Sequence, residues 1–168
     1  SDRAASLALQ SDGKILVCGR SGGSSYWSFA IVRYNTDGSL DLTFDTDGIA
    51  TTSVGIYDSW ASSLVVQADG KILVAGTSYG PPGRFAVVRY NSDGTLDATF
   101  DTDGMVITLI GGDAEAESIA LQDDGKIVVV GKSFVRRLTS TGSIDVTFNT
   151  TGTKSIAFNN VVMNIKSI

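Results

Sequence analysis

The chain has 168 residues, of which 42% are hydrophobic and 18% are charged, with a formal net charge of −5. This composition is typical of a folded domain with a core and not of a disordered segment. Since Lys and Arg form no cluster and no apolar run reaches the roughly 18 residues that cross a bilayer, we expect neither a nucleic-acid partner nor membrane insertion.

Two residue types set limits on catalysis. The sequence has no histidine, which excludes Ser-His-Asp and Cys-His catalysis and removes the commonest general base. Cys18 is the single cysteine, so no intrachain disulfide forms, and its apolar surroundings predict a small buried side chain. We therefore expect no enzyme activity and name no catalytic residue.

The first 54 residues predict four strands joined by tight turns. Gly13 and Gly38 each follow an aspartate and supply the positive φ that such turns need. The segment at 14–19 is continuously apolar, as in a strand covered on both faces. No stretch shows a 3.6-residue helical period. The predicted strands are 6–10, 14–19, 29–34 and 49–54.

This pattern is repeated along the chain. SLALQSDGKILVCG at 6–19 returns as SLVVQADGKILVAG at 63–76 and as SIALQDDGKIVVVG at 118–131. A second block at 29–48 returns at 85–104 and, in altered form, at 134–152. We expect one repeat domain over 1–168, with repeats at approximately 4–60, 61–116 and 117–166.

Four antiparallel strands per repeat indicate an all-β protein, a β-propeller with three four-stranded antiparallel blades. A β-solenoid is the rival fold, but its coils are about half as long; a β-sandwich has no reason to repeat at this length. Because propellers close with about four to eight blades, we expect a partial ring. Further blades of a longer chain, or a homo-oligomer, would complete it.

The two blocks together read A-x-Q-x-D-G-K-I-x-V-x-G followed by F-x-x-x-R-Y-N-x-D-G-x-L-D-x-x-F-x-x-x-G. This motif resembles the bacterial delta-60 propeller-repeat family. The first two repeats match it almost completely, whereas the third has Leu138 and Thr139 in place of Tyr-Asn. The resemblance implies an extracellular or cell-surface location, since such repeats occur in large secreted or surface-attached proteins. It implies no catalytic residue and no cofactor.

Two acidic loops suggest a metal site. Asp45 and Asp47 are followed by a glycine, and Asp101 and Asp103 repeat the arrangement. Paired carboxylates of this kind open many calcium loops, but no third acidic position or distal Glu follows. We expect plain Asp-Gly turns with no cofactor, and keep calcium as the alternative.

An arginine in the third strand of each repeat precedes an aspartate by eight residues. The pairs are Arg33 with Asp41, Arg89 with Asp97 and Arg137 with Asp145. Because a residue present in every blade has a structural role more often than a catalytic one, we expect an ion pair that anchors the bend into the fourth strand.

The repeats differ most at 20–28, 77–84, 55–60, 111–117 and 132–133, which we expect on one face of the disc. These segments hold the candidate ligand- or partner-binding residues Tyr26, Trp27, Tyr57, Trp60 and Tyr79. The opposing interpretation is that these aromatic side chains pack between blades.

The leading functional hypothesis is a non-enzymatic interaction or structural scaffold with a protein or glycan partner. The alternatives are a propeller that binds carbohydrate or another small ligand, and part of an enzyme whose active site needs further blades.

Overall fold

The computed structural model describes residues 2–22, 25–110 and 114–156, and this part of the chain is all-β, with three four-stranded antiparallel sheets. Blade 1 contains β1 (Arg3–Leu9), β2 (Ile15–Gly22), β3 (Trp27–Tyr34) and β4 (Ile49–Thr52). Blade 2 contains β5 (Ser59–Val66), β6 (Ile72–Ser78), β7 (Arg84–Tyr90) and β8 (Met105–Thr108). Blade 3 contains β9 (Ala116–Leu121), β10 (Ile127–Gly131), β11 (Phe134–Leu138) and β12 (Thr153–Ser155). The prediction of three four-stranded antiparallel blades is confirmed.

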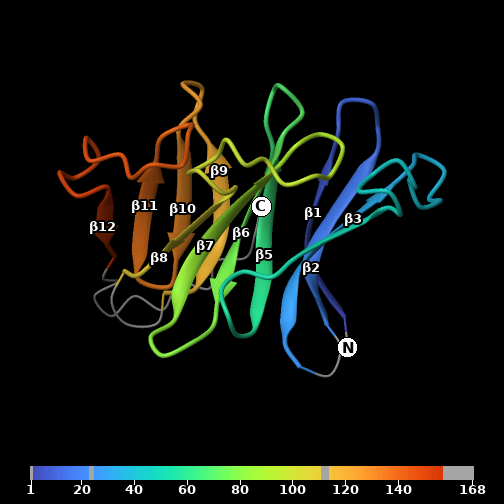
Figure 1. Ribbon diagram of the computed structural model, residues 1–168. Coiled ribbons are helices and arrows are strands. Elements are labelled where there is room, and N and C mark those ends of the chain that lie inside the picture. The colour runs from blue at the N-terminus through green and yellow to red at the C-terminus, as the bar shows by residue number, and fades with distance from the viewer. Residues whose placement is uncertain (1, 23–24, 111–113, 157–168) are drawn as a thin grey trace, which may run out of the picture.

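The blades stand side by side, and the array does not close into a ring (Figure 1). Turns between the first and second strands, and those between the third and fourth, emerge at the upper side of this view; we call this side the turn face. The loops between second and third strands and the connections between blades emerge at the lower side, the loop face. Among the described residues, no helix is long and apolar enough to span a bilayer.

Blade 2 packs against a neighbour on both of its faces. Along β6, Ile72 and Val74 belong to the core shared with blade 1, whereas Leu73 and Ala75 belong to the core shared with blade 3. Successive side chains of a strand point to opposite faces, so a strand between two cores has to be apolar at every position. This explains the continuous apolar run, and Cys18 is buried in the first of these cores, as the sequence predicts.

Several strands extend beyond their predicted limits. Cross-strand pairing of β2 with β3 continues through Arg20–Phe29 to Gly22–Trp27, so most of the predicted loop at 20–28 is strand. Trp27 therefore lies on β3, and Trp60 lies on β5, although the sequence placed both in loops. The physical reason is that main-chain pairing extends the hairpin although the side chains there break the apolar alternation.

Each innermost strand is interrupted by a β-bulge at an equivalent position. In blade 1 the register with β2 shifts between Ala4 and Ser6, and blade 2 shifts at the same point of its repeat. A Cβ at Gly19 or Gly76 would overlap the bulged main chain, namely the carbonyl oxygen of Arg3 or Trp60. The glycine that ends each KILVxG motif therefore makes room for the bulge.

The turn after the third strand packs against the preceding blade. At Gly94 φ is +94°, and a Cβ there would lie 3.0 Å from the ring of Phe44 in blade 1. Gly142 has the same relation to Phe100, whereas a Cβ at Gly38 would meet nothing within 4 Å. This turn is therefore an inter-blade contact in blades 2 and 3, while in blade 1 its outer side is open.

We predict that Gly94→Ala destabilises the protein more than Gly38→Ala does. Both substitutions place an alanine in the left-handed region, which costs about 1–2 kcal/mol. Only Gly94→Ala also forces a methyl group against Phe44, an overpacking cost of about 1–3 kcal/mol. Urea denaturation of both variants measures the difference; equal losses would show that the Phe44 contact carries no constraint.

Candidate functional site

The guanidinium of Arg33, on β3, contacts both the bend that follows β3 in blade 1 and a turn of blade 2. Its Nε donates to Asp41 Oδ2 at 2.7 Å and its Nη2 donates to the hydroxyl of Thr43 at 3.2 Å, both within blade 1. Its Nη1 donates to the carbonyl oxygen of Ser92 in blade 2 at 2.6 Å. Lys14 adds an ion pair of 2.8 Å to the same oxygen of Asp41. We call this arrangement the inter-blade latch.

Blade 2 makes the same latch with blade 3. Arg89 Nε donates to Asp97 Oδ2 at 2.7 Å, and Nη1 donates to the carbonyl oxygen of Ser140 at 2.8 Å. The guanidinium also lies 4.7 Å from the ring centroid of Phe100, within the range of a cation–π contact. The predicted pairing of arginine with aspartate in each blade is thus confirmed, and the contact with the next blade is additional.

Blade 3 builds the same latch without an acceptor in a following blade. Arg137 Nε donates to Asp145 Oδ2 at 2.8 Å, but Nη1 has no acceptor among the described residues. The Arg137 side chain is 19% exposed, compared with 8% for Arg33 and 9% for Arg89. Among the described residues, Nη1 of Arg137 therefore lacks the inter-blade acceptor that Arg33 and Arg89 have.

Hydrogen bonding keeps the latch carboxylates ionised. The hydrogen bond from Lys14 is the largest of the influences that hold the pKa of Asp41 well below its usual range. Burial acts in the opposite direction at Asp97, yet the net pKa is lowered there too. At Asp145 the hydrogen bond from Thr147 is the largest cause of a pKa lowered to about 2. Ionised, hydrogen-bonded aspartates of this kind suit a structural role, since a general acid or base needs a pKa near neutrality.

We predict that Arg89→Ala lowers the free energy of unfolding by about 3 kcal/mol, because it leaves a buried carboxylate with a single cationic partner. Arg137→Ala, the matched control, removes a more exposed pair with no following blade and should cost about 1 kcal/mol. Chemical denaturation of the two variants tests this ranking. If Arg137→Ala costs as much as Arg89→Ala, the inter-blade hydrogen bond contributes nothing.

The acidic loops form left-handed turns. Asp45 and Thr46 have φ of 45° and 72°, and the loop closes through Gly48. The amide of Asp45 donates to the carbonyl oxygen of Asp93 in blade 2 at 2.7 Å. Asp47 accepts the amide of Ile49 at 2.9 Å, which is a local Asx turn. The Asx turn supplies a structural reason for the carboxylate of Asp47, and the left-handed backbone at Asp45 is one that aspartate adopts more readily than most residues.

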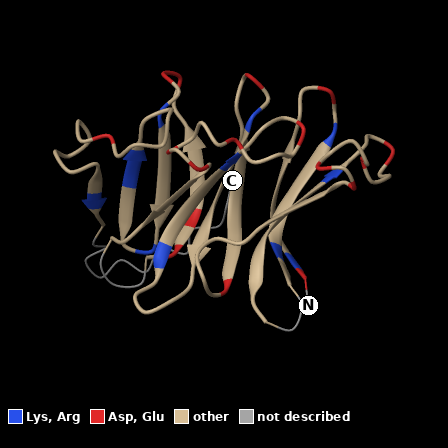
Figure 2. Ribbon diagram, viewed as in Figure 1, with Lys and Arg blue, Asp and Glu red and all other residues tan. Residues whose placement is uncertain are grey.

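The second acidic loop repeats these features. Asp103 accepts the amide of Met105 at 2.9 Å, and Asp101 donates its amide to Thr141 of blade 3 at 2.9 Å. Burial, followed by the charge of Asp103, raises the pKa of Asp101. Figure 2 shows most of the acidic residues in turns at the turn face.

A calcium site in these loops stays a prediction. Within 2–22, 25–110 and 114–156, no three His, Cys, Asp or Glu side chains gather at metal-binding distance. A calcium ion at Asp45 and Asp47 would therefore depend on carbonyl or water oxygens for most of its shell.

Four of the five predicted aromatic residues form two pairs, one between blade 1 and the connection into blade 2 and one within blade 2. Tyr26 and Tyr57 meet edge to face, with ring centroids 6.0 Å apart. Trp60 and Tyr79 lie 5.7 Å apart, with ring planes tilted by 33°. The three tyrosines are exposed and lie in loops.

Trp27 has a different environment. Its amide donates to Asp58 Oδ1 at 2.8 Å, which ties β3 to the connection into blade 2. The guanidinium carbon of Arg20 lies 3.7 Å from the centroid of its ring. Trp27 is only partly exposed, so the packing interpretation accounts for it, whereas Tyr26, Tyr57 and Tyr79 remain available to a partner.

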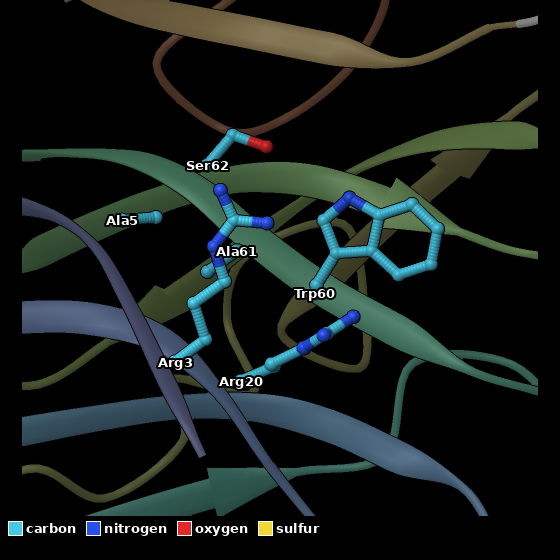
Figure 3. Close-up of a pocket in the computed structure, with 6 residues that line it drawn as sticks. All are labelled: Arg3, Ala5, Arg20, Trp60, Ala61 and Ser62. Carbon is cyan, nitrogen blue, oxygen red and sulfur yellow. The ribbon is translucent and has the colours of Figure 1, made fainter. Parts of the chain in front are cut away.

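A pocket that the sequence does not predict lies where the first strands of blades 1 and 2 meet. Figure 3 shows Arg3 and Arg20 extending from blade 1 toward Trp60 and Ser62 on β5. Arg3 and Arg20 are far apart in sequence but pair across β1 and β2. A sequence signal does exist: at these positions the three repeats carry different residues within an otherwise repeated strand.

Comparison with known proteins agrees with the fold. A family model described as a domain of unknown function (DUF5122) beta-propeller matches residues 10–44, 67–100 and 122–148, more than half of the chain. The structure is similar to that of a protein of unknown function from Bacteroides caccae, solved by crystallography at 1.35 Å. The TM-score is 0.54 and the identity 15%, over 96% of this chain and 48% of that protein.

The chain thus spans about half the length of its structural neighbour. At this level of identity the similarity concerns the fold alone. A search of curated proteins found no significant match.

Proposed function

This chain belongs to the DUF5122 beta-propeller family, and on that premise we propose that it is a non-enzymatic scaffold whose loop face binds a protein partner. The observation that carries the proposal is the exposed aromatic group Tyr26, Tyr57 and Tyr79, which spans two blades. Exposed tyrosines on a stiff framework supply large contact areas at small entropic cost.

A groove lined by both apolar and polar residues accompanies these tyrosines. It has a volume of about 240 Å³ and lies between the connection at 55–57 and the loop at 78–84. Ile56, one of its lining residues, is 79% exposed. Pro81 and Pro82 line the opposite side. An exposed aliphatic side chain beside tyrosines and prolines is typical of a protein-binding surface.

The turn face is a weaker candidate for recognition. Its turns are almost identical between repeats, and the carboxylates of Asp37 and Asp93 are engaged by the main chain of the same turn. The loops of the loop face differ in length and sequence, while the blades beneath them are alike. Binding residues usually lie on variable loops that a constant framework holds in place.

The resemblance to the delta-60 repeats supports two further parts of the proposal: an extracellular or cell-surface location in a bacterium, and a role without catalysis. Binding of a carbohydrate or small ligand is the second candidate function, and the pocket at Trp60 favours it. An active site completed by further blades is the third.

We predict that Tyr57→Ala and Tyr79→Ala each weaken partner binding at least tenfold, because truncating a central aromatic contact costs more than about 1.4 kcal/mol. Binding would be measured against secreted and surface proteins of the source cells and, in parallel, on a glycan array. Leu42→Ala, which changes an exposed residue away from the loop face, is the control. Unchanged binding by both tyrosine variants would contradict the proposed surface.

We further propose that another blade of the same repeat covers the outer face of blade 1. Leu7, Leu64 and Ile119 occupy equivalent positions in the three blades and are 64%, 6% and 7% exposed. Leu64 and Ile119 are buried because each faces a preceding blade. This blade would come from a longer chain or from a second copy.

We predict that the isolated chain associates with itself in solution, so that its mass rises above 17.6 kDa with concentration. Leu7→Asp should restore the monomer, because it places a charge where an apolar contact forms. Sedimentation equilibrium measures both. A wild-type chain that stays monomeric at millimolar concentration would contradict docking between copies and leave a longer chain as the source of the blade.

A further inference from the structure

The pocket beside β5 has the dimensions and the lining of a small-ligand site. Its volume is about 320 Å³, at the lower end of the range for ligand pockets. Arg3 and Arg20 supply positive charge, Trp60 supplies an aromatic face, and Ser62 supplies a hydroxyl (Figure 3). Ser62 is the bulged residue of β5, outside the regular ladder.

The two arginines form a like-charge pair across antiparallel strands. Arg3 and Arg20 are direct register partners, an arrangement that destabilises a sheet when nothing neutralises it. The equivalent partners in blade 2 are Trp60 and Thr77. In blade 3 the equivalent residues, Glu115 and Lys132, form an ion pair of 2.6 Å. Only blade 1 therefore concentrates charge of one sign at this position.

No carboxylate of the described residues compensates this charge. None of their ion pairs involves Arg3 or Arg20. The nearby Asp2 accepts a hydrogen bond from the hydroxyl of Ser21 at 2.8 Å instead. Asp58 accepts the amide of Trp27. The pocket therefore holds excess positive charge that an anionic ligand would neutralise.

Arg20 also has an unused donor. Its Nε is buried and has no hydrogen-bond acceptor among the described residues. Stacking on Trp27 at 3.7 Å holds the guanidinium plane in place. A fixed guanidinium with an unsatisfied N–H is preorganised for a carboxylate, which it binds through two parallel hydrogen bonds.

We propose that this pocket binds an acidic sugar, with the carboxylate on Arg3 and Arg20 and the apolar face of the pyranose ring on Trp60. Ser62 would hydrogen-bond a ring hydroxyl. A uronic acid has this combination of carboxylate, flat apolar face and hydroxyls. The site adjoins the proposed protein surface, because Trp60 packs on Tyr79 at 5.7 Å, but its charged residues Arg3 and Arg20 lie outside that surface.

The test is isothermal titration calorimetry with galacturonate and glucuronate oligosaccharides and, in parallel, with their methyl esters. The esters keep the ring and hydroxyls but lose the charge. We expect binding of the acids and at least a tenfold weaker affinity for the esters. Equal affinity for acid and ester, or no heat from either acid at millimolar concentration, would overturn the proposal.

Variants separate the parts of the site. Arg3→Gln and Trp60→Ala should each weaken acid binding at least tenfold. Lys154→Gln makes the same change of charge on an exposed residue outside both the pocket and the proposed protein surface and should leave binding unchanged. If acetate or inorganic phosphate competes as well as the sugar, and Trp60→Ala has no effect, the pocket is a plain anion site and the sugar proposal is wrong. Loss of sugar binding with intact partner binding in Arg3→Gln would keep this site separate from the loop face.

Discussion

The guanidinium in the third strand of each blade is the contact on which the array depends. Hydrophobic cores hold adjacent blades together, but apolar packing by itself is non-directional and tolerates sliding of one sheet over another. Arg33 removes that freedom, since one planar group donates to an aspartate in its own blade and to the Ser92 carbonyl in the next. In blades 2 and 3 the turn after the third strand is held against the preceding blade by this bridge.

Much of the fold can be predicted from the sequence because the same pattern of strands and turns occurs in three copies. The Asp-Gly turns, the apolar second strand and the arginine–aspartate pair are local features with local causes. The inter-blade hydrogen bond has no such signature, since its acceptor is a main-chain carbonyl that any residue provides. The predicted end of the second strand, at residue 19, is too early for a related reason. Main-chain pairing extends β2 to Gly22, although the side chains there are polar or small.

The candidate sites were less predictable than the fold. Tyr26, Tyr57 and Tyr79 lie in loops that differ between copies, and that difference was visible in the sequence. The pocket of Arg3 and Trp60 depends on strand register and on contact between two blades, neither of which a repeat alignment contains. In both cases the residues common to the copies build the framework, and the residues that differ form the candidate sites.

The latch also gives the array a direction. Blades 1 and 2 each donate from the third strand to a carbonyl of the following blade, so both of these inter-blade contacts join unlike surfaces. Contacts of this kind are heterologous, and they end in a closed ring only when the rotation per blade divides a full circle. Otherwise they continue as an open filament. The angle between neighbouring blades therefore decides between a disc and a fibre, and the turns packed on Phe44 and Phe100 lie at the interfaces where that angle is fixed.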